Sequence, residues 1–189
     1  QSDYTQFLVE RQYADMMTNK ELYTKASQLR PEGLIKGRKG GKREVAYPIN
    51  SIEDISMIDQ VLRDESVKFI NQAVDEGKPF YLIHSFSKIH NDNYPAPKYK
   101  GASPAAMPVR DAMVEVDDIT GELVALLKEK GQLENTLIIF TSDNGPNEDT
   151  WPDSGYSPWR GGKGTTWEGG VRIPGIAYWK GMISAGQVN

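Results

Sequence analysis

The chain has 189 residues, which is the length of one ordinary domain and is enough to bury a substantial core. Its 22 basic and 26 acidic residues give a formal net charge of −4, and no basic run with interleaved aromatic residues occurs, so we expect no nucleic-acid partner. No apolar stretch reaches the length of about 18 residues that a membrane span needs, and the absence of cysteine excludes disulfides and thiolate zinc sites.

The first 50 residues give the weakest pattern in the chain. Short amphipathic helices are predicted within residues 4–17 and 22–29. Residues 33–43 are rich in glycine and in basic side chains. This composition predicts a solvated loop or hairpin, and contact with an anionic substrate is the alternative.

From residue 51 onward the pattern is that of alternating helices and strands. Ser51 has the character of a helix N-cap, and Gly77 is expected to end the helix that follows. Strand, helix and strand in this order predict a crossover unit, and hence an α/β fold with a largely parallel central sheet flanked by helices. The predicted elements are a helix over 59–74, a strand over 80–86, a helix over 111–130, a strand over 136–141 and a short strand over 173–179.

An aspartate and an asparagine stand directly after the strand over 136–141. That strand is a continuous apolar and β-branched run, which predicts burial on both faces. Ligands in open α/β sheets bind beyond the carboxyl ends of the strands. Asp143 and Asn144 offer hard oxygen donors there, so they are candidate ligands for Ca²⁺ or Mg²⁺. An aspartate in a simple turn is the alternative.

Lys163 lies within a glycine-rich segment that follows this pair. The segment is not a phosphate-binding P-loop, because Ser157 holds the place of the first glycine and Gly164 that of the hydroxyl residue. A lysine flanked by glycines can still bring a point charge close to an oxyanion. Arg160 could contact the substrate in a similar way, or it could form a salt bridge with Glu168 or another local acid.

The chain has two histidines, and their positions differ. His84 lies inside the strand over 80–86, which favours a core or near-core imidazole. His90 follows that strand, in a loop that opens at the same sheet edge as Asp143 if the strands are parallel. There it could donate a hydrogen bond to a substrate oxygen and shuttle a proton, with a histidine that only packs the loop as the alternative. Lys88 is a candidate substrate contact in the same loop, with a solvated lysine as the alternative.

The irregular segment 147–159 is rich in aromatic residues and proline. Its place between Asn144 and Lys163 predicts that it forms part of a pocket wall. Trp151, a candidate substrate contact, could pack on an aryl or sugar ring together with Tyr156 and Trp159. The same three rings could equally form a small core of the loop itself.

Two ordered motifs, Thr141-Ser-Asp-Asn-Gly145 and the run from Arg160 to Pro174, resemble the later part of the catalytic domain of type I sulfatases (arylsulfatases). This family belongs to the alkaline phosphatase-like superfamily, whose fold is an α/β sandwich. The resemblance implies that Asp143 and Asn144 ligate calcium and that His90 and Lys163 hold the sulfate. It covers residues 51–189 well and residues 1–50 poorly, within a single catalytic domain.

Two parts of that family's site have no counterpart in the sequence. Sulfatases make a formylglycine nucleophile from a Cys/Ser-x-Pro/Ala-x-Arg segment, and none occurs here. The family's metal-binding Asp-Asp pair is missing too, since Asp117 and Asp118 lie inside a helical pattern. We therefore expect the chain to be a later fragment of a catalytic domain and to be inactive alone.

The resemblance implies a calcium-dependent hydrolase of sulfate esters, acting on a sulfated small molecule or a sulfated carbohydrate. Two alternatives stay open: a phosphatase or phosphonate hydrolase on the same fold, and a non-catalytic binder of sulfated glycans. Because specificity resides in loops, the sequence does not name the substrate. The family further implies a periplasmic, secreted or lysosomal location.

Overall fold

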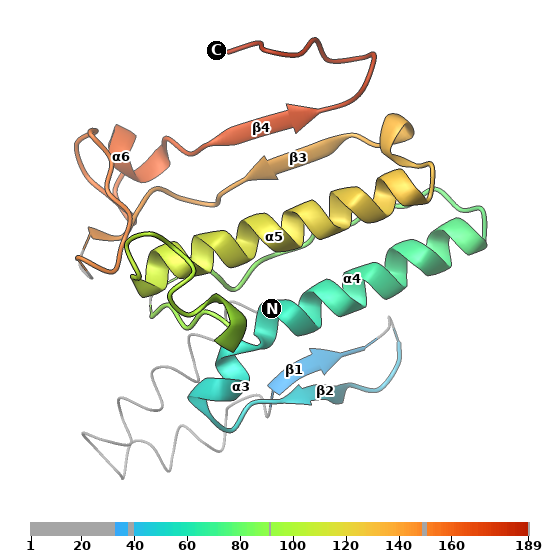
Figure 1. Ribbon diagram of the computed structural model, residues 1–189, viewed down its shortest axis with the longest axis horizontal. Helices are drawn as coiled ribbons and strands as arrows, with labels where there is room; N and C mark the ends of the chain where they lie inside the picture. The colour runs from blue at the N-terminus through green and yellow to red at the C-terminus, as the bar shows by residue number, and fades with distance from the viewer. Residues whose placement is uncertain (1–32, 38–39, 91, 149–150, 189) are drawn as a thin grey trace.

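The computed structural model describes residues 33–37, 40–90, 92–148 and 151–188, so the helices expected within residues 4–17 and 22–29 lie outside the described residues. Figure 1 shows the arrangement of the elements. In chain order these are β1 (Gly33–Lys36), β2 (Glu44–Pro48), α3 (Ile52–Ser56), α4 (Ile58–Asp75), η1 (Pro97–Tyr99), α5 (Pro108–Glu129), η2 (Leu133–Asn135), β3 (Ile138–Thr141), α6 (Glu168–Val171) and β4 (Gly175–Tyr178).

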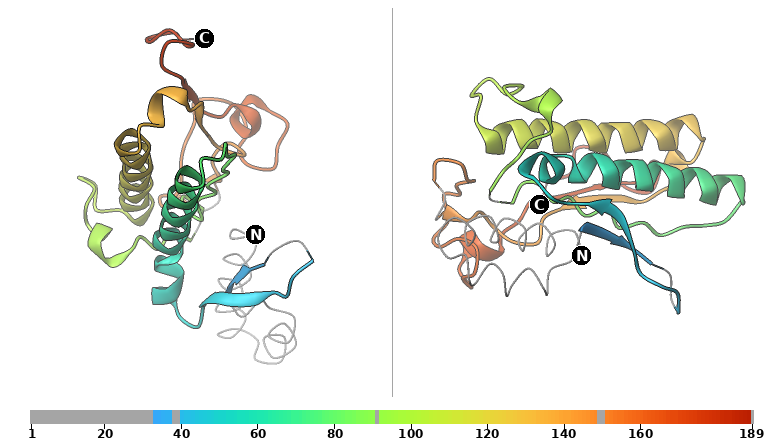
Figure 2. Two further views of the ribbon diagram at one scale, coloured as in Figure 1. Left: turned by 90° about the vertical axis from the view of Figure 1, so that its right-hand side faces the viewer. Right: turned by 90° about the horizontal axis from the view of Figure 1, so that it is seen from below.

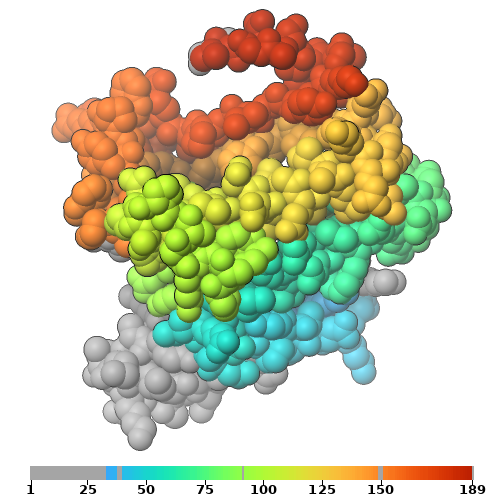
Figure 3. Space-filling view, viewed as in Figure 1, coloured from blue at the N-terminus to red at the C-terminus, as the bar shows by residue number. Residues whose placement is uncertain are grey.

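The two long helices, α4 and α5, form one layer of the molecule, on one face of the strands (Figure 2). They lie side by side, with the β1–β2 hairpin next to α4 and the β3–β4 pair on the side of α5 (Figures 1 and 2). Figure 3 shows that the segment after β4 stands off from this body. In the described residues no helix is both long and apolar enough to cross a membrane.

Both predicted helices are confirmed, and their ends have local causes. Ser51 accepts a hydrogen bond from the Asp54 amide at 3.1 Å and so caps α3, which leads into α4. Gly77 ends α4 in the left-handed region, at φ +61°, as the sequence predicts. Pro108 begins α5 at a position where its missing N–H costs nothing.

The core of the N-terminal part lies between the hairpin and the start of α4. The described residues of 33–48 form an antiparallel hairpin, with Leu34 opposite Tyr47, which agrees with the loop or hairpin predicted for residues 33–43. A cluster of buried side chains joins the hairpin to α3 and α4; its members are Leu34, Ile49, Ile55 and Ile58.

The predicted parallel sheet is not seen among the described residues. They hold two antiparallel pairs, β1–β2 and β3–β4, and Ile138 faces Tyr178 in the second pair. Residues 80–86 are extended but belong to neither pair, and their side chains alternate between half-buried and exposed. The even positions pack towards α4, where Phe80 meets the Phe69 ring edge-to-face with ring centroids 6.0 Å apart.

The expectation that β3 is buried on both faces is also wrong for this structure. Ile139 on β3 is 64% exposed, and Ile176 on β4, which pairs with Phe140, is 64% exposed as well. Tyr81 and Ile83 in the extended segment are exposed to a similar degree. The helical layer covers one face of β3 and of residues 80–86, whereas all four residues of β4 are exposed, and the described residues place nothing over the other face.

Candidate anion and metal site

The candidate site is built around the turn that follows β3. Thr141 is the last residue of the strand, and its hydroxyl donates to the carbonyl of Pro174 at 3.0 Å, which ties the turn to the residue before β4. Asp143 is exposed and Asn144 is half-buried. The Asn144 amide nitrogen donates to the Gly145 carbonyl at 2.7 Å, which orients that side chain.

Asp143 and Asn144 can supply only part of a calcium shell. Ca²⁺ takes about six to eight oxygen ligands, from carboxylates, amide carbonyls and water. Within the described residues, no group of three or more histidine, aspartate or glutamate side chains could hold a metal ion. The chemistry of the two donors fits a hard cation, but the other ligands would have to come from outside this group.

Glycines allow the Lys163 segment to pack directly on the turn after β3. The Gly145 amide donates to the Gly170 carbonyl at 2.9 Å. A Cβ at Gly145 would lie 1.8 Å from the Gly169 oxygen, and one at Gly169 would lie 1.7 Å from the Gly161 oxygen. The Lys163 amide donates to the Pro146 carbonyl at 2.8 Å. Bare backbone is therefore required at these contacts, and they place Lys163 beside the turn.

The structure brings His90 and Lys163 together from positions far apart in the chain. The distance between Lys163 Nζ and His90 Nε2 is 3.0 Å. Lys163 is exposed and His90 half-buried, so both can reach a ligand from solvent. If the lysine is charged, Nζ donates and Nε2 accepts, which requires a neutral imidazole with its proton on Nδ1. An anion between them could accept from Nζ and, once the ring is protonated, from Nε2.

Arg160 pairs with an aromatic ring rather than with Glu168. Its guanidinium lies over the Trp167 ring, 3.9 Å from the centroid. Glu168 instead pairs with Arg172, at 2.6 Å. Arg160 is exposed, and its carbonyl accepts from the Gly169 amide at 2.9 Å. The side chain thus lies at the rim of the glycine segment.

An open pocket of about 330 Å³ lies beside the glycine segment, with Glu148, Trp151, Gly155 and Tyr156 around it. Trp151 is 69% exposed and Tyr156 75% exposed, so neither ring forms a core of the loop. The loop is anchored to α5, because Asp153 accepts from the Val109 amide at 2.7 Å, in the first turn of that helix.

The remaining predicted residues lie in the interior. His84 is a near-core imidazole, as its position in the strand indicates: Nδ1 is 2.8 Å from the Ser66 hydroxyl, and burial lowers its pKa. The Lys88 side chain is only 1% exposed, and its amine is 3.0 Å from Asp59 Oδ2. Lys88 therefore does not present its amine to a ligand in this structure, and the expectation of a substrate contact does not agree with its burial.

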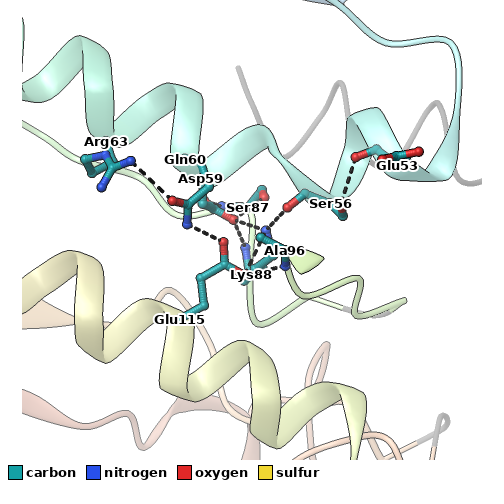
Figure 4. A network of polar contacts seen from close by, with 9 residues as sticks. All are labelled: Glu53, Ser56, Asp59, Gln60, Arg63, Ser87, Lys88, Ala96 and Glu115. Atoms are coloured by element: carbon teal, nitrogen blue, oxygen red, sulfur yellow. Dashed lines mark hydrogen bonds and ion pairs between the residues drawn. The ribbon is translucent and has the colours of Figure 1, made fainter. Parts of the chain in front are cut away.

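Sequence reasoning missed two buried carboxylates, Asp59 and Glu115, which Figure 4 shows converging on Lys88. Both are fully buried, on α4 and α5. The available signal was an acidic residue at a core-facing helical position. Glu115 follows Ala112 by three residues and precedes Ile119 by four, and both of those neighbours are buried.

Comparisons with known proteins agree with the motifs around this site. A family model described as Sulfatase matches residues 2–189. N-acetylgalactosamine-6-sulfatase of Mus musculus is 37% identical over 145 residues, which are 76% of this chain and 28% of that protein. Arylsulfatase A of Bos taurus is 36% identical over 118 residues, 62% of this chain and 23% of that protein.

Solved structures give the same result. Ps i-CgsB in complex with k-i-k-neocarrahexaose superposes with a TM-score of 0.62 at 31% identity, over 68% of this chain and 29% of that one. A structure from work on the metabolism of multiple glycosaminoglycans by Bacteroides thetaiotaomicron has a TM-score of 0.59 at 30% identity, over 70% of this chain and 28% of that one. The chain thus spans less than a third of the length of each of these four proteins.

Proposed function

Because the chain belongs to the sulfatase family and forms part of that family's domain, we propose that the protein containing it hydrolyses a sulfate ester, and that His90 and Lys163 hold the sulfate group. The observation that carries this proposal is the 3.0 Å contact between Lys163 Nζ and His90 Nε2. The two side chains come from separate loops and meet at a position open to solvent.

The chemistry of this pair suits a sulfuryl group. Lys163 supplies a compact positive charge with three N–H donors, and the glycines around it keep other side chains away from a bound anion. His90 can donate a hydrogen bond from a ring N–H to a sulfuryl oxygen. Preorganised donors of this kind stabilise negative charge that grows on the sulfuryl oxygens during ester cleavage.

Two groups that sulfatases use would have to be completed from outside the described residues. Asp143 and Asn144 would hold part of a Ca²⁺ site, with Mg²⁺ as the alternative ion, and the cation would neutralise charge on the sulfate when bound. The formylglycine nucleophile cannot come from these 189 residues, since they contain no cysteine and no matching serine segment. We accordingly propose that these residues alone do not turn over substrate.

We further propose a sulfated carbohydrate or a sulfated aryl compound as the substrate. The exposed rings of Trp151 and Tyr156 offer flat apolar faces next to the glycine segment, and sugar or aryl rings pack on such faces. Arg160, which is exposed over Trp167, could contact a further anionic group of the substrate. The family resemblance also leads us to propose a periplasmic, secreted or lysosomal location.

The test is steady-state kinetics on the complete protein with an aryl sulfate, for Lys163→Ala against Lys128→Ala. Lys128 is an exposed lysine in the last turn of α5, so it controls for loss of charge alone. We expect Lys163→Ala to lower turnover by at least ~100-fold, the scale for losing one transition-state donor, and Lys128→Ala to have no effect. Equal kinetics of the two variants would remove Lys163 from the site.

The same assay separates the other functions that this fold allows. Faster hydrolysis of the matching aryl phosphate would move the protein to the phosphatases or phosphonate hydrolases. Retention of a sulfated glycan without any hydrolysis by the complete protein would make it a binding module.

A further inference from the structure

The loop that carries His90 is anchored at both of its ends in the protein interior. Ser87 and Lys88 precede the loop, and Ala96 follows it; these residues are 1%, 6% and 1% exposed. Between them Ile89 is 47% exposed and His90 half-buried. The loop therefore leaves the interior at Lys88, carries His90 outward and is buried again from Asn93 on, with Ala96 bonded to α5 as described below.

Asp59 on α4 holds the first end. Its Oδ1 accepts from the Ser87 amide at 2.7 Å, and its Oδ2 accepts from the Ser87 hydroxyl at 2.6 Å. The same Oδ2 accepts from the Lys88 ammonium at 3.0 Å. One buried carboxylate thus fixes both the backbone and the side chains of the two residues that lead into the loop.

Glu115 on α5 holds the second end. Its Oε2 accepts from the Ala96 amide at 2.9 Å, while its Oε1 accepts from the Gln60 side chain at 2.7 Å. The Lys88 ammonium lies 3.5 Å from the same Oε2 and so bridges the two anchors. Figure 4 shows the two helices on either side of this contact, with the loop between them.

We propose that Asp59 and Glu115, bridged by Lys88, are positioning residues that set the place of His90 relative to Lys163. Two carboxylates and one ammonium are costly to bury, and apolar side chains of the same volume would often serve stability equally well. What apolar side chains cannot provide is directed bonding to the backbone at both ends of one short loop. Here that bonding fixes the path of the segment from which the His90 ring reaches Lys163, 3.0 Å away.

This inference rests on the proposed function only in taking His90 and Lys163 as an anion-binding pair. It can be measured without turnover, because the ring signals of His90 report its position and protonation directly. His84 serves as an internal reference, since its ring packs on Phe86 and bonds to Ser66 rather than facing Lys163.

The experiment compares Glu115→Gln with Glu129→Gln in the complete protein labelled with ¹⁵N-histidine. Glu129 is an exposed glutamate at the end of the same helix, so the chemical change is matched. Glu115 accepts from the Ala96 amide and from the Gln60 side chain. Glutamine at this position has only one acceptor oxygen, so its NH₂ group would face one of these two donors. We expect Glu115→Gln to shift the His90 ring signals with His84 unchanged, and to weaken inorganic sulfate binding by about 10–100-fold, the scale on which small misplacements act. Glu129→Gln should change neither.

A second variant covers the case in which Glu115→Gln fails to fold. Ser87→Ala removes one hydroxyl donor to Asp59 and nothing else, so it should produce a smaller shift of the same His90 signals. Unchanged His90 signals and unchanged sulfate affinity in a folded variant would overturn the proposal. If the wild-type protein binds sulfate and the variants show these shifts, but the wild type hydrolyses no sulfate ester, the proposed function fails while the positioning role stands.

Discussion

Replacing Lys88 by methionine should destabilise the protein far more than replacing an exposed lysine in an ion pair of similar length. The Lys88 ammonium is 3.0 Å from Asp59 and 3.5 Å from Glu115, and the three side chains are between 0% and 1% exposed. Methionine keeps most of the volume and removes the charge. Two carboxylates would then be buried without a counter-charge, because the remaining donors to them are neutral.

The size of the expected loss of stability depends on how deeply each ion pair is buried, and not on the distance between its charged atoms. Removing one partner of a buried ion pair costs about 3–5 kcal/mol of unfolding free energy. The matched control is Lys36→Met, whose amine is 2.8 Å from Glu65, with the two side chains 55% and 37% exposed. An exposed pair of this kind contributes about 0–1 kcal/mol. Although the Lys36–Glu65 ion pair is the shorter one, its loss should therefore lower stability less than the loss of Lys88.

Urea denaturation of the complete protein measures both variants. With a slope of about 2 kcal/mol per molar urea, Lys88→Met should lower the midpoint by roughly 1.5–2.5 M. Lys36→Met should lower it by roughly 0.5 M at most, by the same conversion. If the two midpoints fall by the same amount with unchanged slopes, the argument from buried charge is refuted.

Three further predictions concern other parts of the structure. Gly145→Ala should abolish sulfate binding in an isothermal titration, because the new Cβ would lie 1.8 Å from the Gly169 oxygen, whereas Gly175→Ala meets no atom within 4 Å and should bind as wild type. Ser51→Ala removes the acceptor for a first-turn amide and should cost about 1 kcal/mol in urea denaturation, so an unchanged midpoint would contradict the capping role. Burial lowers the pKa of His84, with a nearby aspartate charge opposing it, so below a pH of about 6.5 the unfolded chain binds the proton more readily and stability falls as the pH drops. His84→Gln should flatten the difference in urea midpoint between pH 7.5 and pH 5.5, and an undiminished difference would contradict this assignment.

The helices could be predicted from the sequence because their signals are local. Ser51 and Gly77 each mark a helix boundary through their own backbone chemistry, and apolar residues at helical spacing complete the pattern. The predicted start of α5 is three residues late, because the prediction does not use the signal of Pro108 at the first position. The sheet could not be predicted in the same way. Residues 80–86 and β3 have the composition of strands with neighbours on both faces, and the described residues supply a covering layer on one face only. The composition of a strand indicates that it can pack on both faces, but tertiary structure decides which elements lie against those faces.

The two sides of the candidate site differ in the same way: one is supported by residues close in sequence, and the other by residues far apart in sequence. On the Lys163 side, the support is bare backbone packed against bare backbone, so the requirement is visible in the sequence as a run of glycines next to the lysine. On the His90 side, the support consists of carboxylates that lie 28 and 29 positions from Ser87 and Lys88, and 19 positions from Ala96. No local pattern connects Asp59 or Glu115 to that loop, and each taken alone is an ordinary helical acid.

For Lys88 the sequence predicts a substrate contact where the structure has a buried side chain. The sequence places Lys88 two residues before His90 and gives no sign that its side chain turns inward. A long polar side chain beside a functional residue is thus as consistent with holding that residue in place as with contacting its ligand, and only burial distinguishes the two.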